Sequence, residues 1–176
     1  MSDLEAQLVK HIEDVHALEQ HMLRALDGLI ETTNDPEMRE TLRHHKEETD
    51  QHRERLAECL EAHDASPSAV KDTSQILVAL SKGMIDRARP GSAAKNLRDG
   101  FVAEHLEIAS YELLERVAKA AGDTQTVKVA RRNRADEEAM VEKIRAAWDT
   151  AVIESLEQEG VPPSELAGTT ASSRGS

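Results

Sequence analysis

The sequence has very few of the residues that build disulfides or β-sheets. It contains a single cysteine, Cys59, so no disulfide can form within the chain, and an isolated thiol is more often a small buried hydrophobe than a nucleophile. Phenylalanine, tyrosine and tryptophan occur once each. Strands depend on aromatic and β-branched residues, whereas the apolar residues here are mostly alanine, leucine, valine and isoleucine. The composition therefore favours helices and gives Cys59 no chemical role.

Long apolar segments and excess positive charge are missing as well. No apolar run approaches the roughly 18 residues that a membrane-spanning helix needs, and the charged start MSDLEAQLVKHIED is unlike the apolar stretch of a signal peptide. The formal charge of −12 argues against partners such as nucleic acid or an anionic membrane surface, and it tolerates metal ions. We therefore expect a cytoplasmic protein.

The first part of the chain predicts a helical hairpin. A chain of 176 residues is long enough for one domain with a real core. Ser2 and Glu5 have the spacing of a capping box, and apolar residues then recur at intervals of three and four up to about residue 32. A short turn leads to Pro36, at the start of a second helix that ends near His63. A connection this short makes the two helices antiparallel neighbours.

The rest of the chain predicts a long connection and a second hairpin. Within the connection, residues 74–87 predict a shorter apolar helix. A third main helix runs from about 93 to 121, and a fourth, capped by Asp123, ends near Gln158. Residues 160–176 are small, polar and proline-containing, which predicts a disordered tail. Two hairpins joined by one crossover predict an all-α, ferritin-like four-helix bundle over residues 1–159.

Each predicted main helix carries acidic or histidine residues on its otherwise apolar face, near its middle. These residues are Glu19 in the first helix, His45, Glu48 and His52 in the second, Glu104 and Glu107 in the third, and Glu137 in the fourth. A buried ionised carboxylate without a partner costs several kcal/mol, so four such interruptions need a shared compensation. Divalent iron, manganese or zinc supplies it, because carboxylate and imidazole groups bind these metals and the cation cancels the repulsion between the acids.

The distance of these acids from the turns favours a single site, although other interpretations stay open. In both hairpins one acid of each helix lies 13 to 15 residues from the turn, which places these acids at one height in the bundle; they are Glu19, Glu48, Glu107 and Glu137. A single glutamate on a helical face is more often partly exposed, and His45 and His52 could be core histidines with satisfied hydrogen bonds. Arg134 shares the apolar face with Glu137, so a buried Arg–Glu pair is the specific alternative in the fourth helix.

Two further histidines and the acids next to Glu137 are less favoured as metal ligands. His16 lies one turn before Glu19, and His105 follows Glu104 directly, so we expect them to flank the metal ligands. The acids on either side of Glu137 are expected to face solvent.

Three short motifs resemble the YciE/YciF family of ferritin-like proteins over about residues 8–150. They are LEQ at 18–20, HKEET at 45–49 followed by ERL at 54–56, and EHLEIASY at 104–111, the most specific of the three. The resemblance implies a ferritin-like bundle with a dinuclear metal centre and an association with stress responses.

Related di-iron bundles such as rubrerythrin carry one Glu on the first helix, Glu-x-x-His on the second, Glu-x-x-Glu on the third and Glu-x-x-His on the fourth. Glu19 and the pair Glu104 and Glu107 match this pattern directly. In the second helix, a histidine follows Glu48 by four residues instead of three, and no histidine follows Glu137 in the fourth. The fourth helix therefore offers fewer ligands than the resemblance implies.

We accordingly expect a metal-binding protein with two divalent ions, iron in the first place and manganese or zinc as alternatives. All seven residues named above are candidate ligands, with Glu48 and Glu137 bridging the ions. The expected activity is ferroxidase-like or peroxide-consuming, with O2 or peroxide as the electron acceptor. The alternative is a non-catalytic stress or scaffolding protein with a degenerate metal site. A homodimer is the favoured oligomer.

Overall fold

The computed structural model describes residues 2–67 and 93–166, and these residues form four long helices and one short one. The helices are α1 (Asp3–Thr32), α2 (Pro36–Glu61), α4 (Ala93–Ala121), α5 (Thr124–Gln158) and α6 (Pro163–Leu166). There is no strand in the described ranges. The prediction of an all-α four-helix bundle is confirmed, and the predicted helix ends lie within two residues of the observed ones.

Local capping signals set the helix ends as the sequence predicts. Ser2 and Glu5 form the capping box, because the backbone N–H of Glu5 donates to Ser2 Oγ at 3.2 Å and that of Ser2 donates to Glu5 Oε2 at 3.3 Å. Asp35 caps α2, whose first residue is Pro36. Asp123 caps α5 by accepting from the backbone of Gln125 and Thr126. These contacts supply partners for N–H groups that have none within the helix.

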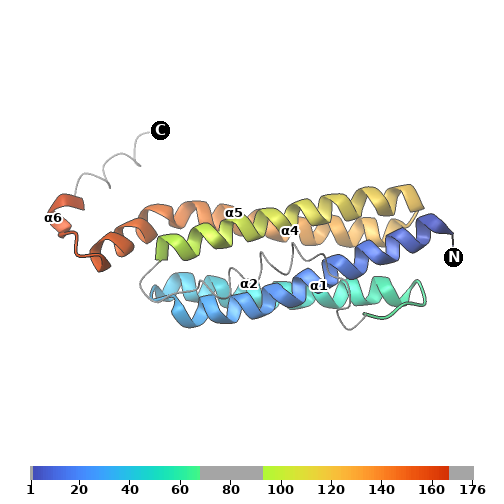
Figure 1. Cartoon of the computed structure of the whole chain (residues 1–176), viewed down its shortest axis with the longest axis horizontal. Coiled ribbons are helices and arrows are strands. Elements are labelled where there is room, and N and C mark those ends of the chain that lie inside the picture. The colour runs from blue at the N-terminus through green and yellow to red at the C-terminus, as the bar shows by residue number, and fades with distance from the viewer. Residues whose placement is uncertain (1, 68–92, 167–176) are drawn as a thin grey trace.

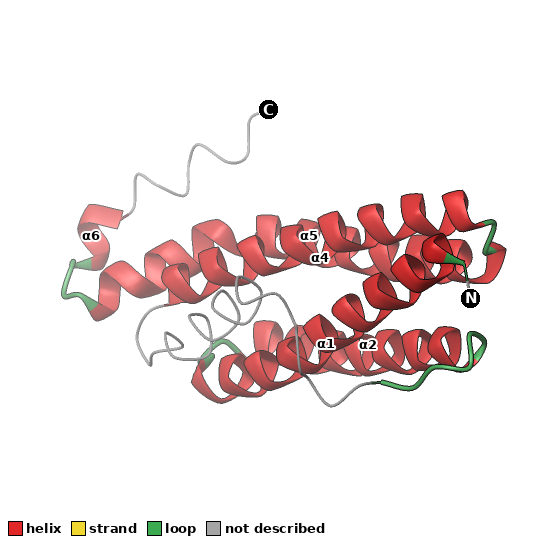
Figure 2. Ribbon diagram, turned by 45° about the vertical axis from the view of Figure 1, so that its right-hand side comes forward, coloured by secondary structure: helices red, strands yellow, loops and turns green. Residues whose placement is uncertain are grey.

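The four long helices form two antiparallel hairpins that lie side by side (Figures 1 and 2). One hairpin is α1 with α2 and the other is α4 with α5, and they meet through α1 against α4 and α2 against α5. α2 ends beside the α4–α5 turn, whereas α4 begins at the opposite end of the bundle (Figure 1). The helix predicted for residues 74–87 lies outside the described residues.

The segment predicted as a disordered tail begins with a turn of helix. Residues 163–166 form α6, directly after α5 has ended. The remainder of the predicted tail, residues 167–176, lies outside the described residues. None of the described helices combines the length and apolarity needed to cross a membrane.

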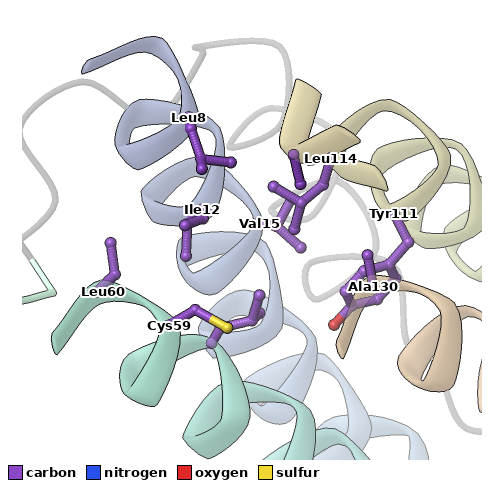
Figure 3. Packing of buried hydrophobic residues seen from close by; sticks show 10 residues of the cluster. Leu8, Ile12, Val15, Cys59, Leu60, Tyr111, Leu114 and Ala130 are labelled. Atoms are coloured by element: carbon purple, nitrogen blue, oxygen red, sulfur yellow. The ribbon is translucent and has the colours of Figure 1, made fainter. Parts of the chain in front are cut away.

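Apolar side chains pack in separate clusters along the bundle. The cluster near the α4–α5 turn includes Leu8, Leu60, Leu114 and the buried Cys59 (Figure 3). A second cluster, near the α1–α2 turn, consists of Leu26, Leu42, Met140 and Ile144 with partly buried neighbours. A third, formed by Leu18, Met22, Ala25 and Ala103, joins α1 to α4. Between the first two clusters, at mid-height, many of the buried side chains are polar.

His63 ties three helix ends together near the α4–α5 turn. Its Nε2 lies 2.9 Å from Asp123 Oδ2, at the cap of α5, and its Nδ1 lies 3.5 Å from Glu5 Oε1, in the first turn of α1. The bond to Asp123 raises the pKa of His63 above its ordinary 6.5, burial opposes this rise, and Glu5 adds to it. The imidazolium form of His63 therefore stabilises the fold.

We predict that His63→Gln destabilises the protein more at pH 6 than at pH 9. A histidine whose pKa is raised by folding contributes stability below its unfolded pKa, and this contribution is lost as the pH rises through the folded pKa. Thermal unfolding at both pH values measures the difference in Tm between wild type and variant. His105→Gln, at an exposed histidine, is the control. An equal Tm difference at the two pH values would contradict the assigned role of His63.

Candidate metal centre

Six of the seven predicted ligand residues meet in the middle of the bundle. Their exposed fractions do not exceed 3%, and all four long helices contribute: Glu19 from α1, His45 and His52 from α2, Glu104 and Glu107 from α4, and Glu137 from α5. These are the residues at which the sequence interrupts each apolar face. The interruptions therefore reflect one shared polar centre within the described part of the chain.

One group of potential ligands, the His52 group, joins α1, α2 and α5. His52 Nδ1 lies 2.9 Å from Glu137 Oε1 and 3.7 Å from Glu19 Oε1. These residues offer ligand atoms that all lie within 4.8 Å of one another, a spacing that one metal ion could span.

A second group, the His45 group, joins α2, α4 and α5. His45 Nε2 lies 3.3 Å from Glu104 Oε1 and 3.5 Å from Glu137 Oε2. Its ligand atoms also lie within 4.8 Å of one another. Glu137 belongs to both groups and directs one oxygen to each histidine. Its carboxylate is therefore shared by the two groups of potential ligands.

Glu107 is the fourth buried glutamate of the centre. Neither of its oxygens has a hydrogen-bond partner. Burial raises its pKa well above the ordinary value, and the negative charges of Glu137, Glu19 and Glu104 raise it further. Glu107 is thus a buried carboxylate whose charge is opposed by the other three glutamates of the centre.

The donor atoms of the centre fit a pair of divalent cations. Several buried oxygens have no hydrogen-bond partner, including Glu19 Oε2, Glu104 Oε2 and both oxygens of Glu107. A buried acceptor without a partner costs about 1–3 kcal/mol, and more when it is charged. Burial raises the pKa of Glu137, the contact with His52 opposes this rise, and the resulting pKa is about 7. Two divalent ions would satisfy these oxygens and cancel the formal charge of the four glutamates.

Asp136 fixes the orientation of the His52 ring through the ring nitrogen that faces away from the centre. His52 Nε2 lies 3.1 Å from Asp136 Oδ2 on the side of the ring away from the centre. Burial would lower the pKa of His52, but its contacts with Glu137 and Glu19 outweigh burial and raise the pKa to about 10. When a metal replaces that proton, Nε2–H can donate to Asp136 and leave the Nδ1 lone pair for the ion. Asp136, expected to face solvent, is 34% exposed and contacts His52.

Glu48 lies behind His45 and outside both groups of ligand atoms. It is 24% exposed, and its Oε2 lies 3.5 Å from Nδ1 of His45, the ring nitrogen that faces away from Glu104. This arrangement parallels that of Asp136 and His52. Glu48 thus contacts the ring of His45 and belongs to neither group of potential ligand atoms, and its predicted bridging role stays a prediction.

A chain of hydrogen bonds leads from the protein surface to Glu19. Arg55 Nη1 donates to Asn133 Oδ1 at 2.8 Å, Asn133 Nδ2 donates to Tyr111 Oη at 3.0 Å, and the Tyr111 hydroxyl donates to Glu19 Oε1. Every bond in this chain donates toward the carboxylate, so the chain orients Glu19 and stabilises its negative charge. Neither Tyr111 nor Asn133 is among the predicted site residues. The missed signal is that Tyr111 lies one turn from Glu107, and Asn133 one turn from Glu137.

The alternative interpretation of α5 does not hold. Arg134 pairs with Glu115 at 3.0 Å, not with Glu137, and remains 24% exposed. Glu115 also contacts Lys119 and Arg131, and these bonds lower its pKa to about 2. Glu137 is thus free of any arginine partner among the described residues.

The two histidines expected to flank the ligands, His16 and His105, lie outside both groups of potential ligand atoms. His16 is buried but belongs to neither group of ligand atoms, and His105 is exposed with its ring against Phe101. Neither therefore joins the donor atoms at the centre.

A family model described as "Domain of unknown function (DUF892)" matches residues 3–157. The chain belongs to this family. The match includes all four long helices and every residue of the centre, so the DUF892 region and the bundle coincide.

Solved structures share this fold. A protein from Xanthomonas campestris pv. campestris is 25% identical over 90% of this chain and 100% of its own, with a TM-score of 0.73. YcfI from Rhodopseudomonas palustris is 24% identical over 82% of this chain and 94% of its own, with a TM-score of 0.68. The E. coli stress protein YciF is 22% identical over 88% and 98%, with a TM-score of 0.73. The DUF892 chain is therefore YciF-like in fold.

We predict that Asp136→Ala weakens metal binding about 10- to 100-fold while the bundle stays folded, because a ligating histidine loses the carboxylate that orients it. Isothermal titration of the metal-free protein with Mn2+ measures the effect. Asp149→Ala, at an exposed aspartate of the same helix, is the matched control. The assigned role fails if both variants bind Mn2+ with wild-type affinity.

Proposed function

We propose that the chain is a ferritin-like protein that holds two divalent metal ions, iron or manganese, and uses them to oxidise Fe(II) or to consume peroxide. The observation that carries the proposal is the position of Glu137. Its two oxygens face two separate histidines, each accompanied by a further glutamate. A buried carboxylate shared in this way suits a two-metal site.

The chain's own residues bind the ions, orient the ligands and exclude water. His52 and His45 each direct one ring nitrogen into the centre, while Asp136 and Glu48 lie at the other ring nitrogen. Tyr111 holds Glu19 in place through its hydroxyl. Iron or manganese, when bound, would supply the redox couple for electron transfer to O2 or peroxide.

A role in stress responses is the second part of the proposal. It is supported by the description of the E. coli relative YciF as a stress protein, together with the shared fold. Removal of free Fe(II) or of peroxide would suit such a role, because both species cause oxidative damage.

A non-catalytic function is the rival proposal, and the composition of α5 favours it. This helix contributes one ligand, Glu137, and has no histidine at the centre. In that case the bundle would bind metal weakly or at one position and act as a scaffold. Oxidation of Fe(II) by O2 faster than in the buffer blank would exclude this rival.

We predict that the wild type binds about two Mn2+ or Fe2+ ions per chain and that Glu137→Gln loses both. The substitution removes the charge and one oxygen ligand shared by the two groups, while it keeps the side-chain volume and relieves repulsion in the metal-free core. Elemental analysis after gel filtration measures the metal content, and circular dichroism checks the fold.

Glu138→Gln is the matched control, because Glu138 is the next residue on α5 and its side chain is 56% exposed. This control should keep both ions and the wild-type rate of Fe(II) oxidation. A Glu137→Gln protein that retains two ions would contradict the proposed site.

A further inference from the structure

A cavity of about 70 Å³ lies between the four long helices, beside the His45 group. Among the described residues, its inner walls are formed by apolar side chains of the α1–α2-turn cluster and its neighbours, Met22, Leu26, Leu42, Met140 and Ile144. A water molecule needs about 10–15 Å³ and two to four polar partners. The cavity is several times larger than that, and its inner apolar walls offer few partners.

The cavity extends from the end of the bundle to the candidate metal centre. Its outer part is lined by polar residues around the α1–α2 turn and the end of α5, including Thr33, Asn34 and Gln158. At its inner end lies Glu104, which is 3% exposed and whose Oε2 has no hydrogen-bond partner. The cavity thus provides an apolar route between the bundle end and one ligand of the His45 group.

The two sides of the centre differ in access. On the Glu19 side, Tyr111 is fully buried and belongs to the apolar cluster near the α4–α5 turn, and its hydroxyl occupies one oxygen of Glu19. On the Glu104 side, the wall of the centre is also the wall of the cavity. A small molecule that reaches the centre through this cavity would meet the His45 group first.

We propose that this cavity binds dioxygen and delivers it to the His45 group. An uncharged, apolar diatomic molecule enters an apolar cavity without losing hydrogen bonds, whereas hydrogen peroxide would leave its donors and acceptors unpaired against these walls. Among the oxidants considered for the centre, the cavity therefore selects dioxygen. The use of the bound dioxygen rests on the proposed function, but its binding needs no metal.

The experiment uses dissolved dioxygen as its own probe, in the metal-free full-length protein. Dioxygen is paramagnetic and speeds the relaxation of nearby protons, and dinitrogen at equal pressure is the diamagnetic reference. We expect a severalfold larger relaxation enhancement at the methyl groups of Leu26, Met140 and Ile144 than at those of Leu8 and Leu60, which are equally buried but lie in another cluster.

Two neighbouring alanines of α5 supply a matched pair of variants. Ala147 lines the cavity and Ala146 is exposed, so Ala147→Leu should fill the cavity and reduce the local enhancement while Ala146→Leu leaves it unchanged. If Ala147→Leu does not fold, Gly100→Ala replaces it. A Cβ at Gly100 would lie 3.9 Å from Ile144 Cδ1, an ordinary contact, and would take up part of the cavity.

The inference is overturned if the enhancement is equal in the two clusters, or if the filling variant leaves it unchanged. A localised enhancement in a protein that binds no metal would uphold the cavity and refute the proposed function. Two bound ions together with an equal enhancement in the two clusters would uphold the proposed function and refute dioxygen binding in the cavity. The two claims therefore fail separately.

Discussion

Four glutamates in one buried space are the constraint on which the rest of the structure depends. Glu19, Glu104, Glu107 and Glu137 come from three helices and approach one another without arginine or lysine partners among the described residues. Ionised carboxylates this close repel strongly, so either protons or cations must accompany them. Burial raises the pKa of both Glu107 and Glu137, and the charges of neighbouring glutamates raise them further.

The two sides of the centre differ in their surroundings. Hydrogen-bonded residues hold the Glu19 and His52 side in place, which we call the fixed side, whereas the Glu104 side borders the cavity. Arg55 lies behind the fixed side, where it bonds Asn133 and also approaches Asp136 at 3.7 Å, so one guanidinium supports both Glu19 and His52. The apolar cavity lies on the other side. Rigid support of the His52 group, together with access to the His45 group, would let the centre hold metal in a fixed geometry while a small oxidant enters.

Local signals predicted most of the fold, and the interrupted apolar faces predicted most of the site. Caps, turns and helical spacing act within a few residues, so their effect can be read from the sequence. Which oxygen faces which nitrogen depends on how the helices rotate against each other, and spacing does not determine that rotation. For this reason spacing did not show that Glu48 lies beside the outer ring nitrogen of His45, or that Asp136 contacts His52.

Anomalous scattering from crystals grown with Mn2+ tests the central claim most directly. The account predicts two peaks between the helices, about 3.5–4 Å apart, one beside His52 Nδ1 and one beside His45 Nε2, with the carboxylate of Glu137 between them. Peaks found only at acidic side chains on the surface, or none between the four helices, would contradict it.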